Sequence, residues 1–390
     1  MRILHLVNHT GRFNGNVHAA VDIACAQAQL GHDVAVCSGG GDFDEVFRQA
    51  NVRVFTYDKR RSVFALVKAI MRFSRLMGKW KPDVVHCHMV ACAVLAYPAC
   101  KWHRKPLVTT IHNAFERAAV LMGIGTRVIA VSAAVGKQMR SRGISSKRLR
   151  VVLNGTIGSL RYPERFPLLP VVQHPVVLYV GGLHPRKGVA DLLKAFDILD
   201  QDGSGAHLYL VGEGPCEAEY KAQARAMDSA PRIHFCGANR DPRGFLQNAD
   251  IFVLASHSDP APLVLSEARE NGCAIIATNV DGVPELLENG DAGLLVDAKS
   301  PEKLADAMKW LISDVTRLAE WRQRSQLNIG HLSLHRVARE TVDVYRECLG
   351  SYHVEVKPGA PSFSLPTTHN SRSPWDRDLH VHNCADEPWP

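Results

Sequence analysis

The stretch from Asn248 to Val296 constrains the fold of this chain more than any other part of the sequence. Residues 250–255 and 274–278 are short, continuous apolar runs, the pattern of strands buried on both faces of a parallel sheet. Between them a polar loop, SHSDPAP, leads to Pro262, which suits the first turn of a helix that stops at Asn271. This order predicts an open α/β sheet, and such sheets bind ligands beyond the carboxyl ends of their strands.

Two carboxylates flank the start of this helix. Asp259 lies in the loop and Glu267 lies eight residues later, on the helix. Both could bind sugar hydroxyls while the free N–H groups of the helix start hold phosphate. The alternative is an ordinary loop or capping residue at Asp259 and a solvated helix residue at Glu267, and the spacing alone favours that alternative.

Composition indicates a globular protein with no membrane span. The 390 residues suit two domains of ordinary size, and 46% hydrophobic with 22% charged residues is typical of soluble folds. The longest apolar stretches, such as residues 90–99, are far shorter than the roughly 20 residues that cross a bilayer. The first residues, MRILHLVNH, resemble a strand and not a signal peptide. Ten cysteines without C-x-x-C pairs favour the reduced cytoplasm.

Charge is divided unevenly along the chain. Residues 1–165 carry 25 Lys and Arg against 9 Asp and Glu, whereas the remainder carries 21 against 30. The basic half is therefore expected to face an anionic partner, either a membrane surface or nucleic acid. Nucleic acid is not expected, because aromatic residues do not alternate with the basic ones and no known binding module is recognisable.

One helix in the basic half could supply a membrane-binding face. Residues 60–81 place an apolar stripe on one side and Lys68, Arg72, Arg75 and Lys79 on the other. Two interpretations stay open: a solvated face over a domain core, or a basic amphipathic helix that contacts anionic lipid. The charge of the whole half favours the second.

Glycine-rich junctions suggest nucleotide binding. The chain begins as strand, loop with Gly11 and Gly15, helix and strand, but the G-x-G-x-x-G fingerprint is absent, so an NAD enzyme is disfavoured. Residues 181–188 form a second junction, with Arg186 and Lys187 placed to bind a diphosphate. This junction is not a P-loop, since G-x-x-x-x-G-K-[ST] does not fit.

These motifs together resemble the retaining glycosyltransferases of family GT4. The resemblance spans residues 1–350 and includes P-D-V-V-H-x-H at residues 82–88, a His at position 112 and Lys187 after its glycine-rich turn. Near the donor site the matching residues are Ser256, Pro262, Glu267, Ala268, Gly272, Ala277, Thr278, Gly282, Pro284 and Glu285. The chain departs from the family at four positions: Asn113 for Asp, Gly182 for a basic residue, Asp259 for Glu, and Pro260 for Gly.

The resemblance implies a GT-B fold, two Rossmann-like domains with parallel sheets facing a central cleft. It implies transfer of a sugar, with retention, from a nucleoside diphosphate sugar to a glycan, glycolipid or lipid-linked acceptor, without a metal or other cofactor. The implied catalytic residues are His112, Lys187, Asp259 and Glu267. The implied donor-binding residues are Gly15, Gly182, Arg186, Lys187, Asn239, Pro262, Leu263 and Glu267.

We expect five segments in order along the chain. They are an acceptor-side domain at 1–160, a linker at 161–175, a nucleotide-sugar domain at 176–333, a helix returning toward the first domain at 334–350, and a disordered tail at 351–390. The tail is rich in proline and poor in aliphatic residues. Its sequence His380-x-His382-x-Cys384 is only a weak candidate for metal binding.

Besides a nucleic-acid-binding protein that uses the basic half, two other functions stay open at this point. A sugar-nucleotide epimerase of the same fold would not need a second sugar, and a non-catalytic sugar-nucleotide-binding partner would explain the departures at Gly182 and Asp259. The expected location is the cytoplasm, with peripheral docking at the inner face of the cytoplasmic membrane.

Overall fold

The computed structural model describes residues 1–57, 63–162 and 172–350, and the side chains of residues 63–66 are not described. The predicted tail at 351–390, with His380, His382 and Cys384, lies outside these residues. So does most of the predicted linker. The described residues belong to one compact unit, so the predicted domain boundaries stay predictions.

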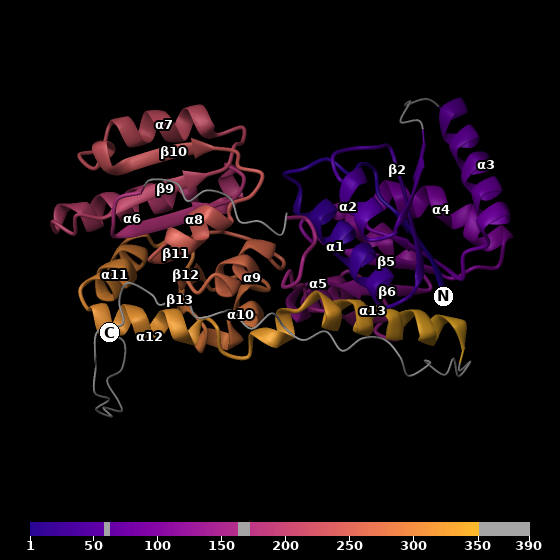
Figure 1. The fold of residues 1–390 in the computed structure, drawn as a ribbon. Helices are drawn as coiled ribbons and strands as arrows, with labels where there is room; N and C mark the ends of the chain where they lie inside the picture. Colours follow the sequence, from indigo (N-terminus) through magenta and orange to yellow (C-terminus); the bar gives the residue numbers. More distant parts are fainter. Residues whose placement is uncertain (58–62, 163–171, 351–390) are drawn as a thin grey trace. The chain divides into compact units, whose positions relative to one another are not determined.

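The amino-terminal part of the chain forms a seven-stranded parallel sheet in the order β3-β2-β1-β4-β5-β6-β7 (Figure 1). The chain winds outward from β1 and then crosses back to β4, so the topological switch point lies between these two strands. The strands are β1 (Arg2–Leu6), β2 (Asp33–Ser38), β3 (Arg53–Thr56), β4 (Val84–Cys87), β5 (Leu107–Ile111), β6 (Arg127–Ala130) and β7 (Leu149–Val151).

Helices connect these strands. The first begins where the Asn14 side chain accepts the N–H of Asn16, and small residues on one side, among them Ala20 and Ala24, bury it against the sheet. The connecting helices are α1 (Gly15–Gln29), α2 (Asp44–Gln49), α3 (Val63–Trp80), α4 (Val90–Trp102), the 3-10 segment η1 (Arg117–Ile124) and α5 (Ala133–Ser141).

The second sheet has six parallel strands in the order β10-β9-β8-β11-β12-β13 and repeats the same winding, with its switch point between β8 and β11. The central strands β8, β11 and β12 are continuous apolar runs, as expected for strands that are buried on both faces, whereas the edge strand β10 is only partly buried. The strands of this sheet are β8 (Val176–Val180), β9 (His207–Val211), β10 (Ile233–Gly237), β11 (Ile251–Leu254), β12 (Ala274–Thr278) and β13 (Leu294–Val296). Two Rossmann-like parallel sheets confirm the predicted fold class.

The helices of this part include short segments near the strand ends. They are η2 (Pro185–Lys187), α6 (Val189–Gln201), α7 (Glu217–Arg225), η3 (Ala230–Arg232), α8 (Arg243–Asn248), α9 (Leu263–Glu270), α10 (Val283–Leu286), η4 (Glu288–Gly290), α11 (Pro301–Ile312), α12 (Val315–Arg324) and η5 (Ile329–Leu332).

The last helix, α13 (Leu334–Leu349), packs against α1 of the first sheet (Figure 1). Its buried face includes Val337, Val342 and Tyr345, which join the core beneath β1 and β2. An isolated bridge between Ile157 and Ser333 fixes the chain just before this helix. A segment distant in sequence therefore completes the amino-terminal core.

Candidate functional site

A cavity of about 500 Å³ lies where loops from both sheets meet. Its volume is within the range of small-molecule sites. Its walls come from the carboxyl ends of strands near both switch points, which is where doubly wound sheets bind ligands. All ten predicted site residues line it: Gly15, His112, Gly182, Arg186, Lys187, Asn239, Asp259, Pro262, Leu263 and Glu267. The structure thus brings them together, while their individual roles stay predictions.

Lys187 and Asp259 form an ion pair inside this cavity. The Lys187 ammonium contacts Asp259 Oδ2, and the Ser256 hydroxyl donates to the same oxygen at 3.2 Å. The turn that carries Lys187 is tight, because a Cβ on Gly188 would lie 1.8 Å from the Ala255 carbonyl oxygen. The predicted phosphate-binding cation and the predicted sugar-binding carboxylate therefore neutralise one another.

Arg186 points to a different wall of the cavity. Its guanidinium lies over the Phe115 ring, 5.1 Å from the ring centroid, and Nη1 donates to the Ser258 carbonyl at 3.4 Å. The prediction that Arg186 supplies a second phosphate-binding charge stays untested. Its packing indicates that it also holds the Ser258 loop in place.

The start of α9 offers backbone donors to the cavity. Pro262 is the N-cap residue and not part of the first helical turn, and Leu263 and Val264 follow it. Within the described residues, the N–H groups of Leu263 and Val264 have no hydrogen-bond acceptor. Free N–H groups at a helix start attract anions.

Glu267 is held by residues that sequence analysis did not identify. Its Oε1 accepts from Arg161 Nη2 at 2.9 Å and from the Tyr162 hydroxyl at 3.1 Å. The guanidinium of Arg161 also bonds both oxygens of Asp22 on α1, at 2.9 Å each, and the side chains of Arg161 and Asp22 are 2% and 1% exposed. Burial raises the pKa of Tyr162, so its hydroxyl stays protonated and donates to Glu267.

This buried ion triad, Asp22–Arg161–Glu267, connects α1 of the first sheet to α9 of the second. No periodicity marks Arg161 in the sequence, because it lies in the irregular segment between the two sheets. A buried Arg needs carboxylate partners, but its partners are over 100 residues away on both sides. The predicted solvated alternative for Glu267 is wrong, because this residue is 8% exposed.

His112 closes the cavity on the side of the first sheet. The residue is 9% exposed, and its Nε2 lies 3.2 Å from Nδ1 of His88. Burial lowers the pKa of His112 to about 4, so its imidazole is neutral near pH 7.

The other end of the cavity contains Gly182 and Asn239. A Cβ on Gly182 would lie 2.9 Å from the His184 ring, so the turn has little room for a larger residue. Asn239 Oδ1 accepts from the N–H of Asp241 at 2.8 Å, and the neighbouring Ala238 N–H donates to Glu213 Oε1 at 3.2 Å. The backbone around Asn239, a predicted donor-binding residue, is thus ordered by side chains of the same wall.

Direct bonds between the loops of the two sheets position the Asp259 loop. The Ser132 hydroxyl donates to the Pro260 carbonyl at 2.7 Å, and Asn154 Nδ2 donates to the Ala261 carbonyl at 3.2 Å. Glu285 accepts the N–H groups of Ala133 and Ala134 at the start of α5. Both sheets therefore contribute to the shape of the cavity.

Two family models cover the two halves of the chain. The model "Glycosyltransferase Family 4" matches residues 13–156, and the model "Glycosyl transferases group 1" matches residues 162–327. The glycogen synthase of Mycobacterium tuberculosis is 28% identical over 371 residues, covering 83% of this chain and 88% of the relative. The lipopolysaccharide core biosynthesis glycosyltransferase LpsE of Rhizobium meliloti is 30% identical over 211 residues, covering 53% and 58%.

Among solved structures, Anabaena HepE in complex with UDP-glucose superposes with a TM-score of 0.74. It is 20% identical, and the match covers 89% of this chain and all of HepE. The fold is thus that of GT-B glycosyltransferases. The chain belongs to the group 1 and family 4 glycosyltransferases, and it is an enzyme of that class.

Proposed function

We propose that this enzyme transfers a sugar from a nucleoside diphosphate sugar, with retention of the anomeric configuration. The observation that carries the proposal is the composition of the cavity. One wall supplies Lys187 and the free N–H groups at the start of α9, which suit a diphosphate. The adjoining walls supply Asp259, Glu267 and His112, which suit sugar hydroxyls.

Lys187 would act on the leaving group. Cleavage of the bond between the sugar and the diphosphate leaves positive charge at the anomeric carbon and a second negative charge on the terminal phosphate of the departing diphosphate. A fixed cation and oriented N–H groups stabilise the departing anion most where charge develops. Because Asp259 already binds Lys187, the carboxylate fixes the position of the ammonium, and its Oδ1 has no partner among the described residues. That oxygen is free to accept a sugar hydroxyl.

A donor screen tests this proposal. Uridine diphosphate glucose is the first donor to try, since the similar HepE binds it. We expect one nucleoside diphosphate to raise the melting temperature, and a hundredfold excess over the dissociation constant corresponds to about 2.7 kcal/mol. With acceptor present, the NMR spectrum of the product should show the anomeric configuration of the donor. An inverted product, or no stabilisation by any nucleoside diphosphate, would contradict the proposal.

The same assay separates transfer from the two alternatives. An epimerase would convert its donor without an acceptor, and a binding partner would be stabilised by nucleotide without turnover. The family assignment favours transfer over both.

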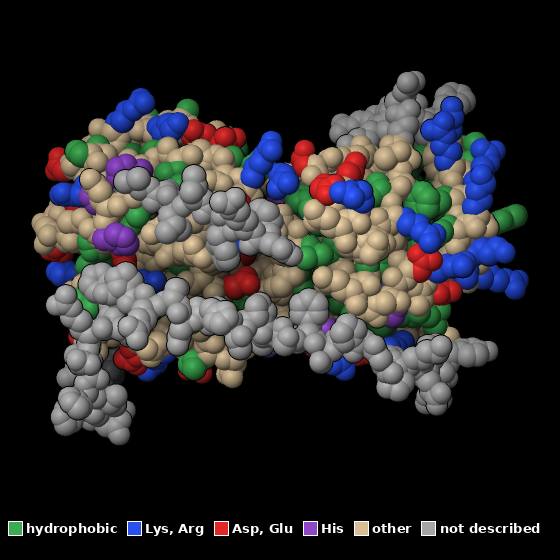
Figure 2. All heavy atoms as spheres, viewed as in Figure 1, with side chains coloured by type: hydrophobic (Ala, Val, Ile, Leu, Met, Phe, Trp, Pro, Cys, Tyr) green, Lys and Arg blue, Asp and Glu red, His purple; other side chains and the backbone are tan. Residues whose placement is uncertain are grey.

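We propose further that the amino-terminal half docks on an anionic lipid surface that carries the acceptor. The similarity to LpsE, which acts in lipopolysaccharide core biosynthesis, supports a lipid-borne acceptor. The docking surface is the outer face of α3 and α4, two helices that pack against each other. Basic side chains gather over α3 at the right of Figure 2. The exposed residues of this surface are Val67, Lys68, Met71, Arg72, Arg75, Lys79, Val94, Tyr97, Lys101 and Trp102.

Apolar residues on this surface distinguish it from a merely solvated face. Trp102 is 82% exposed, and Val67 and Met71 are 50% and 48% exposed between the basic residues. Exposed Trp and aliphatic side chains beside Lys and Arg are typical of helices that lie in a membrane interface. No described helix is long and apolar enough to cross a membrane.

Vesicle sedimentation tests the docking. The variant with Lys68, Arg72, Arg75 and Lys79 changed to Gln should lose binding to anionic vesicles, because each basic group contributes about 1 kcal/mol near such a surface. A matched control changes four exposed lysines of the other half, Lys194, Lys299, Lys303 and Lys309, to Gln. Binding should also weaken as salt shortens the Debye length from about 10 Å at 0.1 M to 3 Å at 1 M. Equal sedimentation with neutral and anionic vesicles would point to a soluble acceptor.

A further inference from the structure

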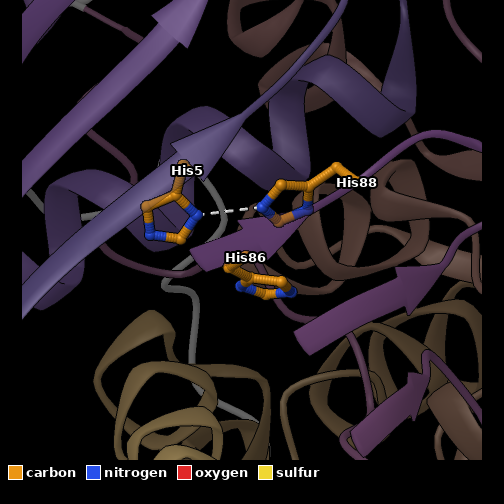
Figure 3. A group of neighbouring side chains, drawn as sticks. All are labelled: His5, His86 and His88. Carbon is orange, nitrogen blue, oxygen red and sulfur yellow. Dashed lines mark hydrogen bonds between the residues drawn. The ribbon is translucent and has the colours of Figure 1, made fainter. Parts of the chain in front are cut away.

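Four histidines lie side by side beneath the cavity, at the carboxyl ends of three neighbouring strands. His5 is on β1, His86 is on β4 directly opposite it, and His88 and His112 follow β4 and β5. His5 and His86 are 0% exposed, and His88 is 3% exposed (Figure 3). Only His112 lines the cavity. The other three have no place in the reaction described above.

The rings of three of them form a continuous hydrogen-bonded chain. His5 Nε2 lies 2.8 Å from Gln27 Oε1, and His5 Nδ1 lies 3.0 Å from His88 Nε2 (Figure 3). His88 Nδ1 in turn lies 3.2 Å from His112 Nε2. The chain therefore runs from Gln27, in the interior of α1, to the wall of the cavity.

These rings do not fit a metal site, although ligand atoms of His5, His86 and His88 lie within 4.8 Å of one another. His86 uses both nitrogens elsewhere, Nδ1 with the Tyr345 hydroxyl at 2.6 Å and Nε2 with Thr110 Oγ1 at 2.7 Å. Its ring also lies against that of His88, with centroids 4.2 Å apart at 37° (Figure 3). A neutral imidazole has one in-plane lone pair to offer a metal, and both ring nitrogens of His86 are already engaged in hydrogen bonds.

The Gln27 amide sets the direction of the chain. Its Nε2 donates to the Tyr345 hydroxyl at 3.1 Å, so its Oε1 faces His5 and accepts a hydrogen bond from the N–H at His5 Nε2. A neutral imidazole donates from one nitrogen and accepts with the other. His88 Nε2 therefore donates to His5 Nδ1, and His112 Nε2 donates to His88 Nδ1.

This order leaves one nitrogen at the end of the chain. His112 Nδ1 has no hydrogen-bond partner among the described residues, and it is not one of the fully enclosed polar atoms without a partner. It is thus an acceptor open to the cavity. Reversing it to a donor would require moving three protons and turning the Gln27 amide over, so that its Oε1 faces the Tyr345 hydroxyl.

We propose that Gln27, His5 and His88 are positioning residues that set the tautomer of His112, so that its Nδ1 accepts a hydroxyl hydrogen bond from the bound donor sugar. This inference rests on the proposed nucleotide-sugar donor for the identity of the ligand. The tautomer itself is a property of the unliganded protein. Burial keeps the relay neutral, since it lowers the pKa of His5 and His112 to about 4 and holds the pKa of His88 well below its usual value.

The first experiment is long-range proton–nitrogen NMR on the full chain labelled with ¹⁵N-histidine, without ligand. We expect the His112 signals to show a protonated Nε2 and an unprotonated Nδ1, with assignment from the His112→Gln variant. A protonated Nδ1 in the unaltered protein would overturn the proposal. So would stoichiometric Zn²⁺ that shifts the His5, His86 and His88 signals together, because those nitrogens would then be free to ligate.

Variants of Gln27 test the relay itself. Gln27→Met can neither accept nor donate, and it should give a mixture of His112 tautomers. Gln27→Glu keeps an acceptor toward His5 and should restore the single tautomer. Thr110→Val is the matched control, because it removes an equally buried partner of His86 that is outside the relay. An unchanged His112 tautomer in Gln27→Met would contradict the proposal.

Kinetic measurements then test whether the tautomer of His112 affects binding and turnover of the donor. Gln27→Met should weaken binding or turnover of the intact donor by about tenfold, the value of one hydrogen bond, and leave the affinity for the free nucleoside diphosphate unchanged. Gln27→Glu should recover most of the loss. Equal losses for donor and free diphosphate would indicate a structural defect only. If no nucleotide sugar is a substrate, the proposed function fails, whereas the NMR result on the tautomer still stands.

Discussion

Lys187 and Asp259 neutralise each other within the cavity, with side chains that are 14% and 7% exposed. A buried pair of this kind is costly to break from one side, because the remaining charge is left without a partner. Substitutions here are therefore expected to change both turnover and stability, and the two effects need separate measurements.

Removal of the cation should affect the leaving group most. We expect Lys187→Ala to lower turnover about a hundredfold or more, as losses of charge-stabilising groups usually do. Steady-state kinetics and urea unfolding should be measured together. The double variant Lys187→Met with Asp259→Asn should regain stability but not turnover. Arg186→Ala should lower turnover less than Lys187→Ala does. Near-normal turnover in Lys187→Ala would contradict the proposal that Lys187 binds phosphate.

The two carboxylates should differ in what their loss does. Asp259→Ala should abolish most activity, because the sugar loses an acceptor and Lys187 loses its anchor, whereas Asp259→Glu should keep some activity. Glu267→Ala should also lose most activity, while Glu267→Gln retains an oxygen that accepts from Arg161. Kinetics with the donor varied will measure these effects. Normal transfer by Asp259→Ala would mean that the carboxylate pair is not used.

The residues of the site could be predicted where sequence order places them at strand ends. Lys187 and Asp259 each follow an apolar run by a short loop, and Glu267 lies on the helix that begins after the Asp259 loop. Parallel strands bring such loops to one edge of the sheet. Arg161 could not be predicted in this way. Its role depends on Asp22 and Glu267, which local patterns cannot connect to it.

Among the elements, strands buried on both faces were the most predictable. The apolar runs predicted at 250–255 and 274–278 correspond to β11 (Ile251–Leu254) and β12 (Ala274–Thr278). Short or mixed elements such as α2, β3 and η1 were not predicted, because they have few residues and little periodicity. The basic helix predicted over residues 60–81 is described from Val63 to Trp80, and its first residues lie outside the described ranges.

The contact of α13 with the first sheet depends on one buried hydroxyl. The Tyr345 hydroxyl accepts from Gln27 and lies 2.6 Å from His86 Nδ1, and the residue is 0% exposed. Tyr345→Phe leaves both partners unsatisfied and should lower the free energy of unfolding by about 1–3 kcal/mol. Tyr97→Phe on the exposed face of α4 is the control and should leave it unchanged. Equal unfolding midpoints in urea would show that the hydroxyl does not secure this helix.

The whole molecule should lose stability in mild acid. In the folded protein, burial lowers the pKa of His5 and His112 to about 4, whereas an unfolded histidine titrates near 6.5. Between these values the unfolded state binds more protons, so the free energy of unfolding rises with pH and falls as the pH drops from 6.5 toward 4. Each ring would cost about 3 kcal/mol at pH 4.

Urea unfolding between pH 4 and 7 measures this dependence. His5→Gln should reduce the slope of stability against pH, and His335→Gln, at an exposed position, should not. Identical slopes for the unaltered protein and His5→Gln would contradict the lowered pKa.

The Asp22–Arg161–Glu267 triad also bears on how halves of such enzymes can be exchanged between relatives. The two family models stop at residue 156 and resume at residue 162, so Arg161 falls in the gap between the parts that each model describes. A hybrid joined in this gap would inherit Asp22 from one parent and Glu267 from the other. Unless both parents pair an arginine with these acids, the hybrid would contain unmatched buried charges although each half is intact. Exchange of whole halves between relatives is therefore limited by Arg161, a single residue that lies outside both matched ranges.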